Sequence, residues 1–546
     1  MPHWTALVEE KRQRQLNSIP QEWLVTPPPD SILDVTDFPE TTGLLNAEEI
    51  EITNTSVDVL LEKLASAEWT AVDVTTAFSK RAIVAHQLVN CLTEIFVDSA
   101  LARAAELDDH LKKTGKVVGP LHGLPISLKD QLCIKGLETT MGYVSWIGQY
   151  ADKNAVLVDV LIECGAVPFV RTNIPQTLMF PETFNNVFGR TTNPYNRSLT
   201  SGGSSGGEGA LVALRGSPLG VGSDIGGSVR IPAAFCGLYG LRPSYGRVPY
   251  CGARNSLEGQ DSVLSVFGPM TNSISGVKIF MKATLLQFGR SGTKTSTISL
   301  DHGSGKDLCF AIMWDDGVVV PHPPIRRSLE ITKAALQKAG HKVVDWKPIK
   351  HKLLGDATRD IWNAGSAEDY MITTSVTGEP IIATMELDDV DPAVASFRPQ
   401  KAGITAYQLW QVQKLRQNVR KEYLDHWEAT ASETGTGRPV DAIICPAAPF
   451  AAPPHGKNRY ANYTTVWNAL DYPAAIFPVT TVDSILDGKE PRRGFYDDLD
   501  KHIHEMYDPE KFKNAPVCLQ LVGRTLEEEA VIKMTEVVDA ALAAAK

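Results

Sequence analysis

Two glycine-rich clusters near the middle of the 546-residue chain constrain its fold more than any other feature. The first reads TSGGSSGGEG over residues 200–209, and the second reads GSDIGGS over 222–228. A flexible linker would continue into polar, low-complexity sequence, whereas here the apolar stretch ALVAL follows the first cluster directly. Glycine is needed where the backbone takes a positive φ or closely approaches another group. The clusters therefore predict tightly folded loops.

The second cluster leads into SVRIPAAFCG, which is typical of a short helix. Ser228 is predicted as its N-cap, Pro232 lies early in the helix, and Gly237 is predicted to end it. A serine at this position would present its hydroxyl beside unpaired N–H groups at the positive end of the helix dipole. Such an anion site beside a hydroxyl is what acyl transfer requires, because negative charge develops on the substrate oxygen.

Two other interpretations of the glycine clusters fit less well. A phosphate-binding loop requires a lysine after the glycines, and no lysine follows either cluster. A GxSxG nucleophile elbow occurs at 202–206, with Ser204 at its centre, but an elbow follows a buried strand, and the preceding NPYNRSLT is polar and contains a proline. The remaining interpretation is a serine hydrolase whose base is a residue other than the usual triad histidine.

Lys129 is the candidate base. It follows LPISL (124–128), which reads as a buried strand. A lysine at a strand end is more often a surface charge, but burial would lower its pKa and make it a usable general base. The sequence alone leaves open whether Lys129 meets Ser204. His122 is a competing base, and its place between Leu121 and Gly123 favours a structural role.

Strand-like and helical segments alternate along the chain, which predicts an α/β fold with a large mixed sheet covered by helices on both faces. The predicted strands are 124–128, 166–172, 308–314, 342–346, 441–447, 474–482 and 517–522. Helices are predicted from Thr55, Thr70, Arg326 and Thr525, with capping boxes at Thr70/Asp73 and Thr525/Glu528. The polar breaks at 289–306 and 429–438 are interpreted as surface loops of a single domain.

Composition excludes several classes of function. Against 64 acidic residues the chain has 53 Lys and Arg, giving a formal charge of −11, and no basic stripe indicates nucleic-acid binding. The N-terminus has no secretory signal and no apolar stretch is long enough to span a bilayer. Eight singly placed cysteines predict reduced thiols and a cytoplasmic protein. His502 and His504 lack metal-site spacing, so a solvated polar segment is favoured there.

The stretches LHGLPISLKD and SGGSSGGEGALVALRGSPLGVGSDIGGSVRIPAAFCGLYGLRPS together resemble the amidase signature family, especially its fungal acetamidase and general amidase branch. The likeness extends to QEWLV, MGYVSW, VPHPPI and the closing APVCLQLVGR. We therefore expect one amidase domain over 1–546, with an N-terminal helical segment (1–80), a catalytic core (81–290) and a C-terminal part (291–546) that completes the sheet and the substrate pocket.

The resemblance implies a role for each matching position. The catalytic lysine corresponds to Lys129, the bridging serine, typically preceded by a cis peptide, to Ser204, and the acyl-forming nucleophile to Ser228. The oxyanion-hole amides correspond to Ile225, Gly226, Gly227 and Ser228, and the supporting positions to Ser205, Asp224 and Arg230. Neither a metal nor an organic cofactor is expected.

The substrate is less constrained than the chemistry. The branch resemblance favours small aliphatic amides such as acetamide, and aryl, indoleacetamide-like or fatty acid amides would use the same residues. A transamidating subunit and a non-catalytic binding protein are further alternatives. We expect a small-molecule amide as the partner, no nucleic acid and no transmembrane segment, and a homodimer is compatible with the sequence. Candidate residues of the acyl pocket are Leu178, Met179, Phe180 and Phe184, for which core packing is an equal interpretation. Tyr143, Trp146 and Trp467 are secondary candidates.

Overall fold

A computed structural model describes residues 3–290, 308–382, 403–492 and 494–545. Its centre is a mixed eleven-stranded sheet in the order β1-β3-β2-β8-β10-β9-β14-β15-β13-β11-β12. The strands are β1 (Leu92–Ile95), β2 (Pro125–Lys129), β3 (Val167–Thr172), β8 (Leu219–Asp224), β9 (Tyr239–Arg242), β10 (Val266–Thr271), β11 (Cys309–Ile312), β12 (Lys342–Asp345), β13 (Ala442–Pro446), β14 (Ala474–Thr481) and β15 (Pro516–Val522). The predicted α/β class is confirmed.

All seven strands predicted from the sequence are present, as β2, β3 and β11 to β15, whereas β1, β8, β9 and β10 were missed. The sequence LGVGSD of β8 contains two glycines, and VFGPMT of β10 contains a glycine and a proline, so neither shows a strand pattern. β10 nevertheless pairs with β8 along its whole length. At Gly268 a Cβ atom would lie 1.9 Å from the Leu241 carbonyl oxygen, so glycine is what permits the close approach of β9 and β10.

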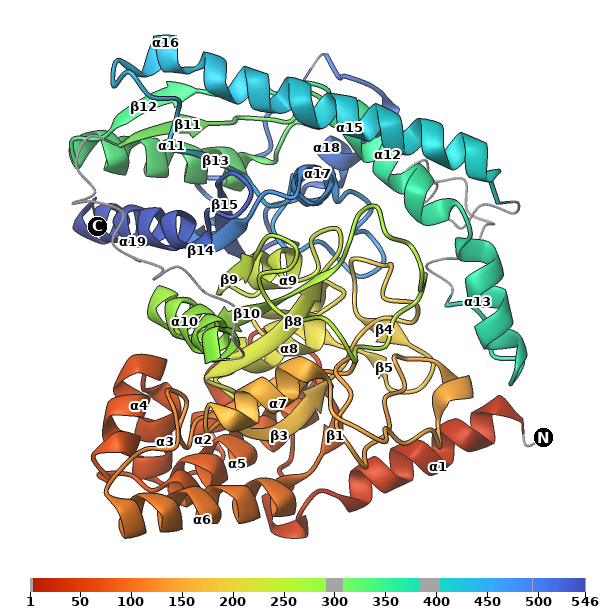
Figure 1. Cartoon of the computed structure of the whole chain (residues 1–546), viewed down its shortest axis with the longest axis vertical. Helices are drawn as coiled ribbons and strands as arrows, with labels where there is room; N and C mark the ends of the chain where they lie inside the picture. The colour runs from red at the N-terminus through yellow and green to blue at the C-terminus, as the bar shows by residue number, and fades with distance from the viewer. Residues whose placement is uncertain (1–2, 291–307, 383–402, 493, 546) are drawn as a thin grey trace.

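Helices cover both faces of this sheet. Along the strand order, the helices of the first hundred residues lie toward the β1 end, at the bottom of Figure 1, and α12, α15 and α16 lie toward the β12 end, at the top. The helices are α1 (Trp4–Asn17), α2 (Phe38–Thr41), α3 (Ala47–Asn54), α4 (Val57–Ala65), α5 (Ala71–Val89), α6 (Val97–Thr114), α7 (Val156–Glu163), α8 (Gly206–Ala213), α9 (Arg230–Phe235), α10 (Ile274–Arg290), α11 (Pro323–Lys338), α12 (His351–Asn363), α13 (Ser366–Ser375), α15 (Ala406–Ala429), α16 (Ala431–Thr434), α17 (Asn462–Leu470), α18 (Asp498–Met506) and α19 (Glu528–Ala545).

Short elements complete the chain. Two 3-10 helices, η1 (Gln21–Trp23) and η2 (Val144–Trp146), lie in the N-terminal half. Small hairpins are formed by β4 (Phe184–Asn185) with β5 (Gly189–Arg190), and by β6 (Thr192–Asn193) with β7 (Asn196–Thr200). These hairpins lie between β3 and the first glycine cluster.

The helix starts test the predicted capping boxes. Thr70 caps α5, since its hydroxyl accepts the Asp73 N–H at 3.0 Å. The box predicted at Thr525 and Glu528 is wrong, because α19 begins only at Glu528. Both side chains instead form hydrogen bonds with residues distant in the sequence. Thr525 Oγ1 donates to the Asp471 carbonyl, and the Glu528 carboxylate accepts the Ser244 N–H.

The two polar breaks have different outcomes. Most of 289–306 lies outside the described residues. The segment 429–438, predicted as a loop, contains the short helix α16. All eight cysteines are within the described residues as thiols, and most of them are buried. Within the same ranges no helix combines the length and the apolarity needed to cross a bilayer.

A buried ion cluster fastens α1 to the rest of the protein. Lys11, only 3% exposed, forms ion pairs with Glu94 on β1 and with Glu138, and Arg14 reaches Glu138 at 2.9 Å. Burial alone would lower the pKa of Lys11, but the two carboxylates together raise it. α1 is therefore held by charge pairs that solvent does not screen.

We expect Lys11→Met to lower the free energy of unfolding by about 3–5 kcal/mol, because removing one partner leaves buried carboxylates uncompensated. Urea unfolding followed by circular dichroism measures the change. Lys113→Met is the matched control, since Lys113 and Asp109 form an exposed helical pair whose loss costs less than about 1 kcal/mol. Equal midpoints for the two variants would contradict the role of the cluster.

Candidate functional site

Lys129 ends β2 with a side chain that is fully buried. Its Nζ lies 2.6 Å from Ser204 Oγ and 2.8 Å from Ser223 Oγ, both hydrogen-bond distances. The structure therefore brings together the lysine and the serine whose contact the sequence left open. Ser223, the residue before Asp224, was not singled out from the sequence, although it lies in the same glycine cluster.

Burial lowers the pKa of the Lys129 ammonium to about 7, while the negative charges of Asp224 and Glu208 act in the opposite direction. A large share of Lys129 is therefore neutral at physiological pH. A neutral amine in contact with a hydroxyl can accept its proton, as a general base must.

The first glycine cluster is a tightly packed loop, as predicted. The peptide bond between Gly203 and Ser204 is cis. A Cβ atom at Gly203 would lie 2.6 Å from the Glu182 nitrogen, so only glycine fits there. Ser205 lies at the start of α8, and its Oγ contacts the backbone nitrogen and carbonyl oxygen of Ser223, each at 3.3 Å. Ser205 thus contacts the neighbouring cluster, and among the described residues no hydrogen bond joins it to Lys129. Its supporting role stays a prediction.

The second cluster is organised by Asp224 at the end of β8. Its carboxylate accepts N–H groups from Gly227 at 2.8 Å, Val229 at 3.2 Å and Arg230 at 3.4 Å. The prediction of Ser228 as the helix N-cap is therefore wrong, because α9 begins at Arg230 and the Asp224 carboxylate takes the amides that a cap would satisfy. The Ser228 hydroxyl therefore does not act as the cap of α9.

The two clusters are joined at Ser228, whose carbonyl accepts the Ser205 N–H at 3.2 Å. Of the four amides predicted to stabilise an oxyanion, that of Gly227 is taken by Asp224. Within the described part of the chain, no protein acceptor is found for the amides of Ile225, Gly226 and Ser228. These three N–H groups are the ones available to an anionic oxygen.

Asp224 and Arg230 form a fully buried ion pair with a distance of 3.0 Å. Burial raises the pKa of the Asp224 carboxyl, but the charge and hydrogen bonds of Arg230 outweigh it and bring this pKa to about 2. The guanidinium also donates to the Thr464 carbonyl, Asn468 Oδ1 and Gln520 Oε1, at 3.0, 2.6 and 3.2 Å. The pair therefore connects the second cluster to α17 and β15.

Glu208 is a buried acid near Lys129 that the sequence interpretation missed. It lies on α8, with its carboxylate accepting hydrogen bonds from Ser127 Oγ at 2.6 Å and Thr172 Oγ1 at 2.8 Å. Thr172 pairs directly with Lys129 across β2 and β3. Burial raises the pKa of Glu208 to about 8. The sequence offered one signal for Glu208, since it is the single charged residue in TSGGSSGGEG.

The predicted pocket residues separate into different surroundings. Met179 lines a cavity of about 290 Å³. Phe180 packs with Tyr370 and Ile382, and Met179 and Phe184 flank this cluster.

A second cluster holds Tyr143 and Leu178, with Trp146 against it. The Tyr143 hydroxyl lies 3.0 Å from Ser256 Oγ. Trp467 is fully buried on α17 among His351, Tyr423 and Tyr472, and it lines neither of the two cavities discussed below. The assignment of these residues to an acyl pocket stays a prediction.

The competing base has a different environment. His122 is 3% exposed, and its Nδ1 accepts the Val118 N–H at 3.2 Å, which agrees with a structural role. His502 and His504 lie on α18. Within the described ranges, no group of three or more His, Cys, Asp or Glu side chains could hold a metal ion.

The comparisons with known proteins agree with this geometry. The family model described as amidase matches residues 73–532. The chain is 43% identical to an acetamidase of Emericella nidulans, covering 98% of this chain and 97% of that one, and 43% identical to an acetamidase of Aspergillus oryzae, covering 98% of each. A solved structure of a fatty acid amide hydrolase superposes with a TM-score of 0.90 at 34% identity, covering 99% of this chain and 95% of that one.

Asp224→Asn is expected to lower the free energy of unfolding at pH 7 by about 3–5 kcal/mol, because it leaves the Arg230 guanidinium buried without its counter-charge. The folded-state pKa of Asp224 is lowered from 3.8 to about 2, so the wild type has this stabilisation above pH 4 and loses it as the pH falls through 2. The difference between variant and wild type should therefore narrow below pH 4.

Chemical unfolding between pH 2 and pH 8 measures this difference. Asp425→Asn is the control, because Asp425 pairs with Lys421 on the exposed side of α15. A difference between Asp224→Asn and wild type that does not change with pH would contradict the assignment of the shift to Asp224.

Proposed function

Because the chain belongs to the amidase signature family, a family of hydrolases, we propose that it hydrolyses a small carboxylic acid amide to the carboxylate and ammonia through an acyl-enzyme. The observation that carries this proposal is the contact between buried Lys129 and Ser204 in a loop adjoining Ser228. A lysine with a pKa of about 7 supplies the base that a serine hydrolase without a catalytic histidine needs.

In the proposed acylation step, neutral Lys129 takes the proton of Ser204, and Ser204 takes the proton of Ser228. The Ser228 oxygen then attacks the amide carbonyl, whose oxygen becomes negative. The family resemblance assigns the oxyanion to the amides of 225–228, and those of Ile225, Gly226 and Ser228 are the unengaged ones.

The relay then runs in reverse. The proton held by Lys129 returns through Ser204 to the nitrogen of the tetrahedral intermediate, the C–N bond breaks, and ammonia or an amine leaves. Water, deprotonated through the same relay, attacks the ester on Ser228 and releases the carboxylate. One amide and one water give one acid and one amine, so no co-reactant is required.

Small aliphatic amides are favoured as substrates, because both fungal relatives with 43% identity carry the name acetamidase. A fatty acid amide is the second candidate, favoured by the TM-score of 0.90 to a fatty acid amide hydrolase. Ammonia release from a series of unbranched amides, with benzamide and indoleacetamide added, distinguishes the candidates by acyl length and shape.

We expect Ser228→Ala and Lys129→Ala each to lower kcat/KM at pH 7 by a factor on the order of 10⁴ or more, as for other residues that act as one catalytic unit. Ammonia release measures the loss. Ser432→Ala, a change in the exposed part of α16, should leave the rate unchanged. Undiminished turnover by a folded Ser228→Ala enzyme would contradict the proposal.

The pH dependence should follow Lys129. Below its pKa of about 7 the lysine is protonated and has no capacity to accept a proton, so kcat/KM should rise with pH and level off above neutrality. Glu208 is largely protonated below its own pKa of about 8, so Glu208→Gln replaces one neutral group by another over the rising limb and should leave that limb in place. Rate profiles from pH 5.5 to 9 test this, and a rising limb that moves to lower pH in a stable Glu208→Gln enzyme would show that Glu208 is charged there and contradict this expectation.

A further inference from the structure

Trp362 lies where two cavities meet. The smaller cavity, of about 290 Å³, is lined by Met179, Tyr370 and Thr465 among others. A larger one, of about 810 Å³, has a polar wall that includes Asp261, Ser262, Gln413 and Arg416. Trp362 lines both cavities.

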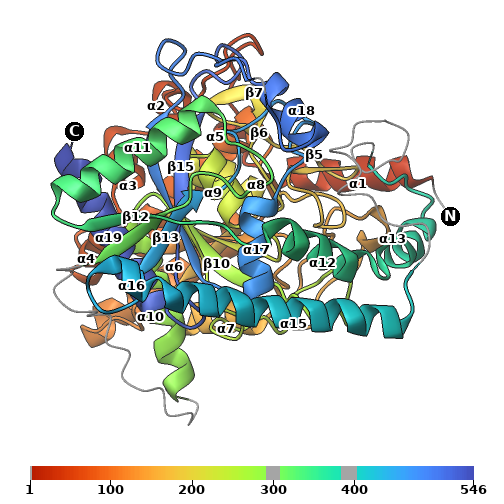
Figure 2. The ribbon, with the colours of Figure 1, turned by 90° about the horizontal axis from the view of Figure 1, so that it is seen from above.

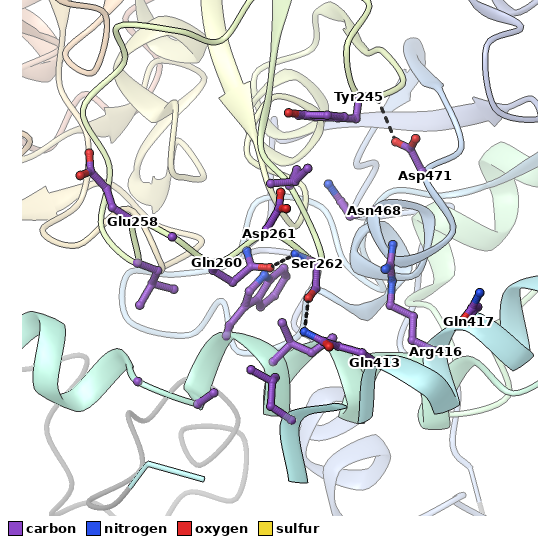
Figure 3. Close-up of a pocket in the computed structure, with 18 of the residues that line it drawn as sticks. Tyr245, Glu258, Gln260, Asp261, Ser262, Gln413, Arg416, Gln417, Asn468 and Asp471 are labelled. Carbon is purple, nitrogen blue, oxygen red and sulfur yellow. Dashed lines mark hydrogen bonds between the residues drawn. The ribbon is translucent and has the colours of Figure 1, made fainter. Parts of the chain in front are cut away.

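The larger cavity is closed on one side by a contact between two segments distant in sequence. Gln413 on α15 donates to Ser262 Oγ at 2.7 Å, and Arg416, Gln417 and Asn468 lie on the same side of the opening (Figure 3). The rest of the lining includes the apolar side chains of Leu257, Leu264, Ile361 and Leu409, so the larger cavity has an apolar side that can take an alkyl chain.

The indole of Trp362 rests on the second glycine cluster. A Cβ atom placed on Gly226 would lie 2.8 Å from Trp362 Cη2, so the ring edge is in contact with the backbone of Gly226. The Gly226 carbonyl is fixed by the hydroxyls of Thr464 at 2.7 Å and Thr465 at 3.1 Å. Trp362 therefore stands beside one of the three unengaged amides, and Thr465 links that position to the smaller cavity.

Packing holds the indole in place. Trp362 is next to the last residue of α12, which lies beside α15 and α17 in both views of the molecule (Figures 1 and 2). The neighbouring Ile361 is 2% exposed and anchors this end of the helix. The indole Nε1 is buried and has no acceptor among the described residues. Since no hydrogen bond fixes the ring, its position follows from helix packing and can be changed by substitution.

We propose that Trp362 is a specificity-determining residue that limits the acyl group to a few carbons, by separating the smaller cavity, which receives the acyl group, from the larger one. The inference rests on the proposed amide hydrolysis and extends it to the residue that sets chain length. Without the indole the two cavities join beside Gly226, and an alkyl chain that the wild type rejects can extend into the larger one.

The test compares wild type, Trp362→Ala and Trp362→Phe on unbranched amides from acetamide to octanamide. A single methylene that a pocket accepts or rejects changes kcat/KM by about 10- to 200-fold. We therefore expect the ratio of kcat/KM for hexanamide to that for acetamide to rise at least about tenfold in Trp362→Ala, and less in Trp362→Phe, which keeps a ring. Trp410→Ala is the matched control, since Trp410 on α15 is 61% exposed and lines neither cavity.

Calorimetric binding of hexanoate and acetate, the product acids, gives a second readout that needs no turnover. An increase in the affinity for hexanoate relative to acetate in Trp362→Ala supports the inference, even if the wild type hydrolyses no amide of the series. That lack of hydrolysis would count against the proposed function alone. Unchanged selectivity in a folded Trp362→Ala protein overturns the inference. Should Trp362→Ala not fold, Trp362→Phe decides by the same ratio.

Discussion

The ion pair between Asp224 and Arg230 is the interaction on which the site depends. It is fully buried, and each partner also has a second role, since the carboxylate accepts hydrogen bonds from the amides of Gly227, Val229 and Arg230 and the guanidinium reaches α17 and β15. A buried charge pair is stable only when its remaining hydrogen-bonding groups are satisfied, and here the groups that satisfy it belong to the second glycine cluster and to α17 and β15 in the C-terminal half. The same ion pair therefore both shapes the second glycine cluster and joins it to the C-terminal half of the chain.

A similar balance sets the charge of Lys129. Burial without a counter-charge would make the amine neutral over most of the pH range, and a close carboxylate would keep it protonated. Neither Asp224 nor Glu208 hydrogen-bonds Lys129 directly, because Arg230 engages the first, and Ser127 and Thr172 engage the second. Both acids act on the lysine only through space. A pKa of about 7 is the balance between desolvation and these indirect charges, chiefly that of Asp224, because Glu208 is largely protonated below its own pKa of about 8.

The sequence predicted the fold class, seven strands and the catalytic candidates Lys129 and Ser204, because these follow from apolar runs, glycine spacing and family motifs. Four strands of the central sheet were missed. Glycine or proline interrupts the usual pattern in LGVGSD, VFGPMT and YGLR, whereas LTEI is only four residues long. Ser228 was wrongly predicted as the helix cap because the local sequence pattern favours a serine at that position. In the structure the carboxylate of Asp224, at the end of β8, accepts the amides that the cap would accept. Ser223 and Glu208 escaped notice because their roles arise from pairing between β2, β3, β8 and α8, which no single segment encodes.

Trp362 shows why substrate preference is the hardest property to predict from the sequence. In the chain it is 136 positions beyond Gly226, on a helix whose pattern indicates only packing. Its proposed role comes from contact with a glycine that has no side chain of its own, so the loop presents bare backbone and a neighbouring element supplies the wall. Catalytic glycine loops that expose amides to an oxyanion also leave the space above them undefined. The residue that fills this space can then change with little effect on the amides, which permits one mechanism to serve amides of different size.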